Sequence, residues 1–194
     1  MQKIIALFVT IFCFFSGTAF STNVFLKYEK DVPQIEYASR KLSEALVEKK
    51  YKVADANTNY DFLISLDVDS GQLGAETFSI IPEGKFITIY GGDNRGLIYG
   101  ALALVEHLKN GVPLEDIKFE NDKPRLEFRG IKFNLPWHTY RPSSALDQHY
   151  ETVCDLKFWE AFLDMMVENR FNVISLWNLG RTTLCFSSEP VASS

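Results

Sequence analysis

The sequence has few of the residues that build metal centres and disulfide-rich frameworks. It contains three cysteines and three histidines in 194 residues, and no His-Glu-x-x-His pattern that would indicate a zinc protease. Only Cys154 and Cys185 follow the first 21 residues, and two cysteines do not make a disulfide framework. We therefore expect no metal site and free cysteines. A Cys154–Cys185 bond in an oxidising compartment is the alternative.

Positive charge is also scarce. Lysine and arginine number 20 against 25 acidic residues, so the formal net charge is -5 and the isoelectric point is near 5.3. A nucleic-acid-binding domain usually has a basic stripe, and this sequence has none, which argues against a nucleic-acid partner. The sequence also lacks internal repeats, and its hydrophobic content of 46% is ample for a core.

No apolar run at the amino terminus is long enough to span a membrane, because spanning requires about 20 residues. Residues 1–21 instead have a positive Lys3, an apolar stretch Ile4–Phe15 and small residues before Ser21. This pattern predicts a cleaved secretory signal, a secreted or periplasmic product, and no membrane association afterwards. Lipid anchoring at Cys13 is a minor alternative, since no lipobox surrounds it.

Residues 22–122 are predicted to form a leading α+β domain, a mixed sheet with two helices on one face. Apolar residues recur at helical spacing in two segments and alternate with polar ones in others. Asp31 and Pro33 mark the first helix start. The predicted order is β-α-β-β-β-α. The expected segments are strand Asn23–Tyr28, a helix from Pro33, strands Tyr60–Val68, Phe78–Ile81 and Lys85–Tyr90, and a helix ending at Gly111. Val112–Asp122 is predicted to be a linker.

Two motifs in this domain have a functional and a structural interpretation. Asp61, Asp67 and Asp69 could bind a metal, but alternating aspartates usually form the wet face of a strand. The glycine-rich segment Gly91–Gly96 could bind phosphate, but its spacing fits neither the dinucleotide nor the Walker pattern. We expect a tight turn with Asp93 or Asn94 capping the second helix. The lone His107 is not expected to be a metal ligand.

Residues 123–179 are predicted to form a β-α-β unit. Phe128–Leu135 and Phe171–Trp177 are apolar strands, joined by a helix Leu156–Asn169 that Asp155 could cap. Two parallel strands require such a crossover. This arrangement is typical of the start of an α/β barrel, whose functional sites lie at the carboxyl ends of its strands. Residues 180–194 are expected to be an irregular tail.

Residues 91–108, with Gly96, Tyr99, Gly100 and Leu104, resemble the end of the accessory domain that precedes the barrel in family 20 glycoside hydrolases (β-hexosaminidases) and in α-glucuronidases. The segment Pro124–Gly130 is similar to the first barrel strand of the hexosaminidases, and residues 163–173 to their first barrel helix and second strand. The resemblance implies a zincin-like accessory domain at 22–122, without zinc, and the first β-α-β unit of a (β/α)8 barrel at 123–179. It implies an oligosaccharide or polysaccharide as partner and no cofactor.

The resemblance also suggests substrate-binding residues. Arg129 matches an arginine that contacts sugar hydroxyls, although it could equally tie its strand to a neighbour. This chain departs from the family pattern at three places. Asn134 replaces an aspartate, and Trp137-His138 replaces an Arg-His pair. On the second strand, Ser175, Trp177 and Asn178 replace a histidine pattern. Trp137 and Trp177 could stack on sugar rings or fill the barrel mouth; the tentative set is Arg129, Asn134, Trp137, His138, Trp177 and Asn178.

The paired carboxylic acids that glycoside hydrolysis requires are not evident. Glu160, Asp164 and Glu168 lie on the predicted crossover helix and are expected to face solvent. A full barrel has about 250 residues, whereas this unit has one crossover. We therefore expect the amino-terminal part of a secreted glycoside hydrolase, inactive by itself and without catalytic residues. The alternative is a stand-alone secreted carbohydrate-binding or interaction module.

Overall fold

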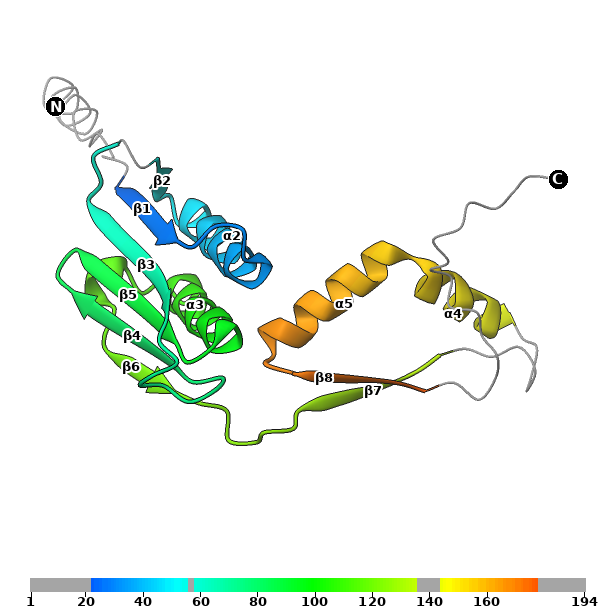
Figure 1. Ribbon diagram of the computed structural model, residues 1–194. Helices are drawn as coiled ribbons and strands as arrows, with labels where there is room; N and C mark the ends of the chain where they lie inside the picture. Colours follow the sequence, from blue (N-terminus) through cyan, green and yellow to red (C-terminus); the bar gives the residue numbers. More distant parts are fainter. Residues whose placement is uncertain (1–21, 56–57, 136–143, 178–194) are drawn as a thin grey trace, which may run out of the picture. The chain divides into compact units, whose positions relative to one another are not determined.

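The computed structural model describes residues 22–55, 58–135 and 144–177. The chain divides into two compact units, the first ending at Asp122 and the second beginning at Lys123 (Figure 1). Both units combine helices and strands, so the predicted mixed α/β class is confirmed.

Unit 1 is built on a mixed sheet of six described strands. Their order across the sheet is β2-β1-β3-β5-β4-β6. The first four of these are parallel to one another, and β4 is antiparallel to both of its neighbours. Helices α2 (Pro33–Glu48) and α3 (Asn94–Lys109) lie side by side on one face (Figure 1). The strands are β1 (Asn23–Tyr28), β2 (Lys52–Ala54), β3 (Phe62–Val68), β4 (Phe78–Glu83), β5 (Phe86–Gly91) and β6 (Glu120–Asp122).

The core of unit 1 lies between the sheet and these two helices. Apolar side chains at helical spacing, such as Leu42 and Leu46 on α2 and Leu104 on α3, are fully buried. They pack on the inward side chains of the strands, among them Phe78 and Ile89. Amphipathic helices are stabilised mainly by burial of this kind. The two helices and their buried faces were therefore predictable from spacing alone.

The start of α2 differs in one detail from the prediction. Pro33 occupies the first turn as expected, but the N-cap residue is Val32, and no side chain caps the helix. Asp31 instead has a positive φ of 67°, and its backbone N–H donates to Glu36 Oε1 at 3.2 Å. The predicted Asp31 cap is wrong because the chain turns sharply one residue before the helix begins.

The segment predicted to be a linker belongs to unit 1. Leu114, in the 3-10 turn Leu114–Asp116, and Ile117 are buried. The three residues of β6 then pair antiparallel with β4. The linker prediction is wrong because a few buried side chains hold an otherwise polar segment on the core. The short strand β2 was also missed, since three residues give no readable periodicity.

The three aspartates of the predicted wet face have local structural partners. Asp61 Oδ2 accepts from the backbone N–H of Asn23 at 2.8 Å, Asp67 Oδ2 from the hydroxyl of Ser65 at 2.6 Å, and Asp69 Oδ1 from Gly71 and Gln72. Ser65 itself is buried, so this face of β3 is less exposed to solvent than strict alternation predicts. Within the described residues, no three metal-ligating side chains form a group that could hold an ion.

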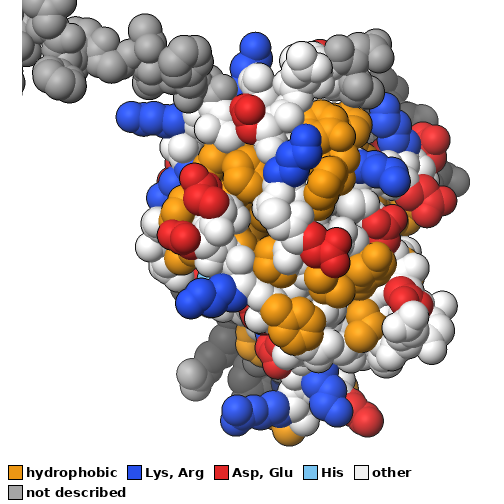
Figure 2. All heavy atoms as spheres, turned by 90° about the vertical axis from the view of Figure 1, so that its left-hand side faces the viewer, with side chains coloured by type: hydrophobic (Ala, Val, Ile, Leu, Met, Phe, Trp, Pro, Cys, Tyr) orange, Lys and Arg blue, Asp and Glu red, His pale blue; other side chains and the backbone are white. Residues whose placement is uncertain are grey.

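The face of the sheet away from the helices shows hydrophobic side chains interspersed with charged ones (Figure 2). Phe25 stacks on Tyr60 with ring centroids 5.8 Å apart. The ammonium of Lys85 lies 5.6 Å from the ring centroids of both Tyr60 and Phe86. Phe86 is 42% exposed. No described helix of unit 1 covers this face.

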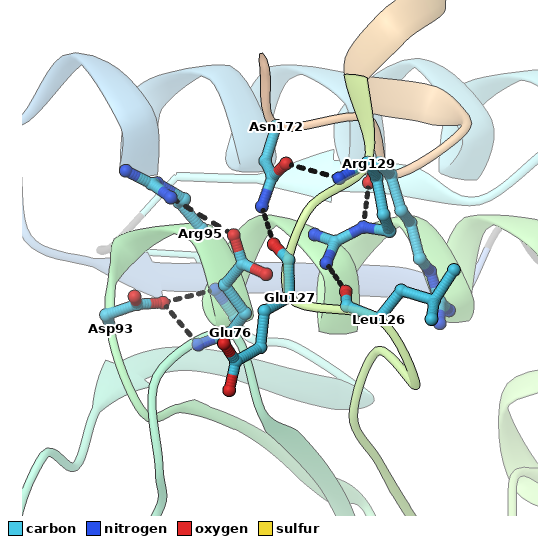
Figure 3. Close-up of polar contacts among 9 residues, drawn as sticks. Glu76, Asp93, Arg95, Leu126, Glu127, Arg129 and Asn172 are labelled. Atoms are coloured by element: carbon cyan, nitrogen blue, oxygen red, sulfur yellow. Dashed lines mark hydrogen bonds and ion pairs between the residues drawn. The ribbon is translucent and has the colours of Figure 1, made fainter.

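The glycine-rich segment forms the capped start of α3 and packs closely against the loop before β4. Asp93 caps the helix and accepts hydrogen bonds from the backbone N–H groups of Gly96 at 2.7 Å and Glu76 at 3.1 Å, and Arg95 pairs with the carboxylate of Glu76 at 3.1 Å (Figure 3). A Cβ on Gly96 would lie 2.2 Å from the Thr77 carbonyl oxygen. Glycine is therefore needed here because the backbone before β4 leaves no room for a side chain. The predicted capping by Asp93 is confirmed.

The described part of unit 2 contains two parallel strands and two helices. Strand β7 (Gly130–Asn134) pairs with β8 (Val173–Trp177). Asp155 caps α5 (Leu156–Glu168) through the N–H of Lys157 at 2.9 Å, as predicted. An additional helix, α4 (Ser144–Cys154), precedes α5 and was not predicted. No helix in the described part of the chain is both long and apolar enough to cross a membrane.

Cys154 is disulfide-bonded. The other two cysteines of the sequence, Cys13 and Cys185, lie outside the described residues. The expectation of free cysteines is therefore wrong for Cys154. The predicted alternative, a Cys154–Cys185 bond, involves a residue outside the described part of the chain and stays a prediction.

Candidate functional site

The candidate site lies at the carboxyl ends of β7 and β8. The strands pair in register, with Gly130 opposite Val173 at one end and Asn134 opposite Trp177 at the other. Beyond the last pair, the Leu135 N–H donates to the Trp177 carbonyl at 2.9 Å. Because side chains alternate along a strand, Lys132 and Asn134 share one face, and so do Ser175 and Trp177 on β8.

The opposite face is covered by α5. Phe133 points to this side, where its ring lies 5.1 Å from Trp159, 5.4 Å from Phe162 and 5.9 Å from Phe158, centroid to centroid. Tilted and edge-on aromatic contacts of this kind add about 0.5–1.5 kcal/mol each to the burial of the rings. The aromatic cluster fixes which face of the two strands turns to the helix, and hence which face is open.

We call the open face at this end the carboxyl-edge site, formed by Lys132, Asn134, Ser175 and Trp177. The Lys132 ammonium lies 4.3 Å from the centroid of the Trp177 ring, well inside the distance of a cation–π contact. Trp177 is 40% exposed, and Asn134 and Ser175 are exposed beside it. The site therefore combines an aromatic surface, a positive charge, an amide and a hydroxyl.

The structure brings together only part of the predicted residue set. Asn134 and Trp177 are register partners at the carboxyl edge. Arg129 precedes β7 and lies at its other end, about 16 Å away along an extended strand. Trp137, His138 and Asn178 lie outside the described residues.

Arg129 is tied to the backbone around the start of the two strands. Its guanidinium donates to the carbonyls of Leu126 and Arg170. Its own backbone N–H donates to Asn172 Oδ1 at 3.0 Å, and Asn172 Nδ2 donates to the Glu127 carbonyl at 2.7 Å (Figure 3). These bonds join the segment before β7 to the turn before β8. These contacts fit the structural role predicted for Arg129, and its sugar-binding role stays a prediction.

Lys132 and Ser175 were not among the predicted binding residues. The signal for both was present in the sequence, since each lies two residues before a predicted one, Asn134 or Trp177, on the same strand. Period-two spacing places such residues on one face. Lys132 and Ser175 could therefore have been predicted from the sequence by applying the two-residue strand period to Asn134 and Trp177.

The chemistry of the carboxyl-edge site suits binding better than proton transfer. Neither β7 nor β8 includes an aspartate or glutamate. Of the acidic residues on α5, Glu160 and Glu168 are exposed as predicted, while Asp164 is half-buried. An ammonium and an amide can bind a carboxylate or a hydroxyl, and a tryptophan face can pack on an apolar surface.

Comparison with known proteins supports the predicted resemblance. No protein-family model matches the sequence, and no curated protein matches it. Among solved structures, a GH138 enzyme targeting pectin rhamnogalacturonan II matches at TM-score 0.68 and 30% identity. A GH115 4-O-methyl-α-glucuronidase with specificity for decorated arabinogalactans matches at TM-score 0.54 and 17% identity. A Streptomyces plicatus β-hexosaminidase in complex with GlcNAc matches at 0.51 and 16%.

These matches extend over most of this chain but a minor part of each enzyme. They cover 80% of this chain in all three cases, and 24%, 25% and 30% of the respective enzymes. At the lower identities the likeness concerns the fold alone. The chain therefore resembles a part of a glycoside hydrolase, and its neighbours are enzymes with barrel-type folds.

Proposed function

We propose that this chain is the amino-terminal part of a secreted glycoside hydrolase that acts in carbohydrate degradation. In this proposal, residues 22–122 form the accessory domain and residues 123–179 contribute the first β-α-β unit of the catalytic barrel. The observation that supports it most is the likeness to the GH138 enzyme, with a TM-score of 0.68 over 80% of the chain. The leader pattern of residues 1–21 supports secretion or a periplasmic location.

The carboxyl-edge site suggests which sugars are bound. An indole face suits the C–H side of a sugar ring, and Lys132 supplies a positive charge beside it. A carboxylate-bearing sugar, a uronate, would place its ring on Trp177 and its charge near Lys132. An α-glucuronidase-like specificity therefore fits these residues better than a hexosaminidase-like one. Trp137, His138 and Asn178, which lie outside the described residues, are proposed as further substrate-binding residues on the resemblance alone.

We propose further that the chain alone binds without hydrolysing. A glycosidase needs an acid near the leaving oxygen and a second carboxylate or an acetamido group of the substrate. The two strands that form the site have neither aspartate nor glutamate. In barrel enzymes the catalytic residues come from the ends of several different strands, so the remaining strands of an intact enzyme would supply them.

Calorimetric titration of the purified chain with oligogalacturonate and with chito-oligosaccharide tests the proposal. We expect oligogalacturonate to bind more tightly, and Trp177→Ala to weaken it about tenfold or more, since a lost contact of about 1.4 kcal/mol has that effect. Incubation with either sugar should release no product. Hydrolysis by the chain would contradict the proposed inactivity, and failure to bind either sugar would contradict the binding role.

A stand-alone carbohydrate-binding or interaction module is the second candidate. Unit 1 has its own sheet and buries its own core, including Phe78, Leu104 and Leu108, so it meets the physical requirement of an independent domain. The two candidates differ in where sugar binds. Binding that is unchanged in the Trp177→Ala variant would favour the module.

A further inference from the structure

A pocket of about 600 Å³ lies on unit 1, remote in sequence from the carboxyl-edge site. It is lined by His107 on α3, by Val112, and by the segment Asp116–Glu120 that leads into β6. Its volume is within the range of about 300–1,000 Å³ in which small-molecule sites fall. We call it the η1–β6 pocket, after the 3-10 turn η1 (Leu114–Asp116) and the strand β6 that flank it.

The wall of this pocket is anchored to the core of the unit. Leu114 and Ile117 are buried, at 1% and 6% exposure. The Leu114 N–H donates to the Tyr51 hydroxyl at 3.3 Å, and the Asp116 N–H donates to the Pro113 carbonyl at 3.1 Å. Side chains on such a segment are presented from a fixed backbone, which lowers the ordering cost of binding.

Phe119 is exposed although it follows closely on a buried residue. Its side chain is 66% exposed and lines the pocket, two residues after the buried Ile117. Scattered exposed hydrophobic residues are common on proteins. An aromatic ring at the wall of a pocket that also has charged side chains, however, supplies a flat apolar surface beside hydrogen-bonding groups.

A paired imidazole and carboxylate lie in the same pocket. His107 Nε2 and Glu120 Oε2 are 2.7 Å apart, and both side chains are partly exposed, at 41% and 31%. The pair joins α3 to β6 and holds the carboxylate in one orientation. An oriented carboxylate accepts hydrogen bonds from the hydroxyls of a ligand, and charged acceptors form the stronger bonds.

We propose that the η1–β6 pocket binds a neutral sugar unit of a glycan. The apolar face of the sugar ring would pack on Phe119, and its hydroxyls would donate to the Glu120 carboxylate that His107 orients. Asp116 and Glu120 contribute two negative charges against the one positive charge of Lys118, so a uronate is disfavoured. The proposal rests on the proposed action on carbohydrate, but it assigns a second site that prefers a neutral sugar, whereas the site at Lys132 is proposed to prefer an anionic one.

Calorimetric titration of the full chain with a galacto-oligosaccharide and, separately, with oligogalacturonate tests this assignment. We expect Phe119→Ala and Glu120→Gln each to weaken galacto-oligosaccharide binding by about tenfold or more. Neither substitution should change oligogalacturonate binding, which Trp177→Ala should weaken instead. Phe86→Ala and Glu83→Gln are matched controls, because both residues are exposed in unit 1 outside the pocket.

Proton NMR provides a readout that a general loss of stability would not imitate. In the wild-type chain, galacto-oligosaccharide should shift the ring signals of His107 and Phe119 and leave those of Phe86 in place. The proposal is overturned if galacto-oligosaccharide does not bind, or if its binding is unaffected by both pocket substitutions. Oligogalacturonate binding that depends on Trp177 would persist in that case, so the two proposals fail separately.

Discussion

Lys132 holds its ammonium 4.3 Å from the centre of the Trp177 ring, although the two residues are not register partners. Lys132 pairs with Ser175, and Trp177 pairs with Asn134. The contact is therefore a diagonal one, bridged by a long side chain and a large ring. It places positive charge and an aromatic surface together at the edge of the sheet where barrel enzymes keep their sites.

The charge of Lys132 should matter for an anionic sugar. We expect Lys132→Met to weaken oligogalacturonate binding by about tenfold, because the apolar stem is kept while the ammonium is lost. Lys132→Arg should retain most of the affinity. The difference should shrink as salt is added, because ions screen exposed charges. Calorimetry at two salt concentrations measures it.

Lys157→Met is the control for that experiment, because Lys157 is an exposed lysine on α5. It should bind oligogalacturonate as the wild type does. Equal affinities for Lys132→Met and wild type would show that Lys132 does not contact the carboxylate.

Gly96 should not tolerate a side chain. A Cβ at this position would lie 2.2 Å from the Thr77 carbonyl oxygen, a backbone atom that cannot move without the loop. We expect Gly96→Ala to lower the free energy of unfolding by roughly 2–3 kcal/mol, measured by urea titration. Gly71→Ala is the matched control: its Cβ would meet Asp69 Oδ1 at an ordinary 3.5 Å. If both variants unfold at the same urea concentration, the close approach of the Thr77 backbone does not explain why position 96 is glycine.

The cap at Asp93 should contribute measurably to unit 1. Its carboxylate accepts from the N–H groups of Gly96 and Glu76, so it ties the start of α3 to the preceding loop. Asp93→Ala should cost about 1–2 kcal/mol of stability, measured by thermal or chemical unfolding. Asp93→Asn keeps an acceptor oxygen and should cost much less. An Asn variant as unstable as the Ala variant would mean that the charge, rather than the hydrogen bonds, stabilises this turn.

Asn172 should hold the strand pair of unit 2 together. Its side-chain amide bonds the Arg129 N–H and the Glu127 carbonyl, and Ala would leave both without these partners. We expect a loss of about 1–3 kcal/mol and faster hydrogen exchange across Gly130–Asn134. Asn169→Ala removes a single bond to the Met165 carbonyl at an exposed helix end and should have little effect. Unchanged exchange in the Asn172 variant would show that strand pairing does not need this bridge.

Sequence pattern alone predicted the long elements well. Helices α2 and α3 have apolar residues at helical spacing, and their buried faces follow from it, while α5 was predicted from the crossover that joins two parallel strands. Asp93 and Asp155 were identified as caps because a short acceptor before an apolar run is a local signal. The resemblance to glycoside hydrolases was likewise visible in short motifs whose order and spacing are set along the chain.

The sequence by itself determined the longer helices and strands and which of their side chains share a face, because both depend on neighbours along the chain. Only the tertiary structure decided the rest: that Ile117 and Leu114 anchor a polar segment, that Cys154 is bonded, and that Arg129 holds backbone carbonyls. It also decided that Lys132 meets Trp177, and that Glu120 meets His107 at the wall of a pocket. The Glu120–His107 and Lys132–Trp177 contacts join residues 13 and 45 positions apart, and their distances are set by how strands and helices pack, which no local pattern encodes.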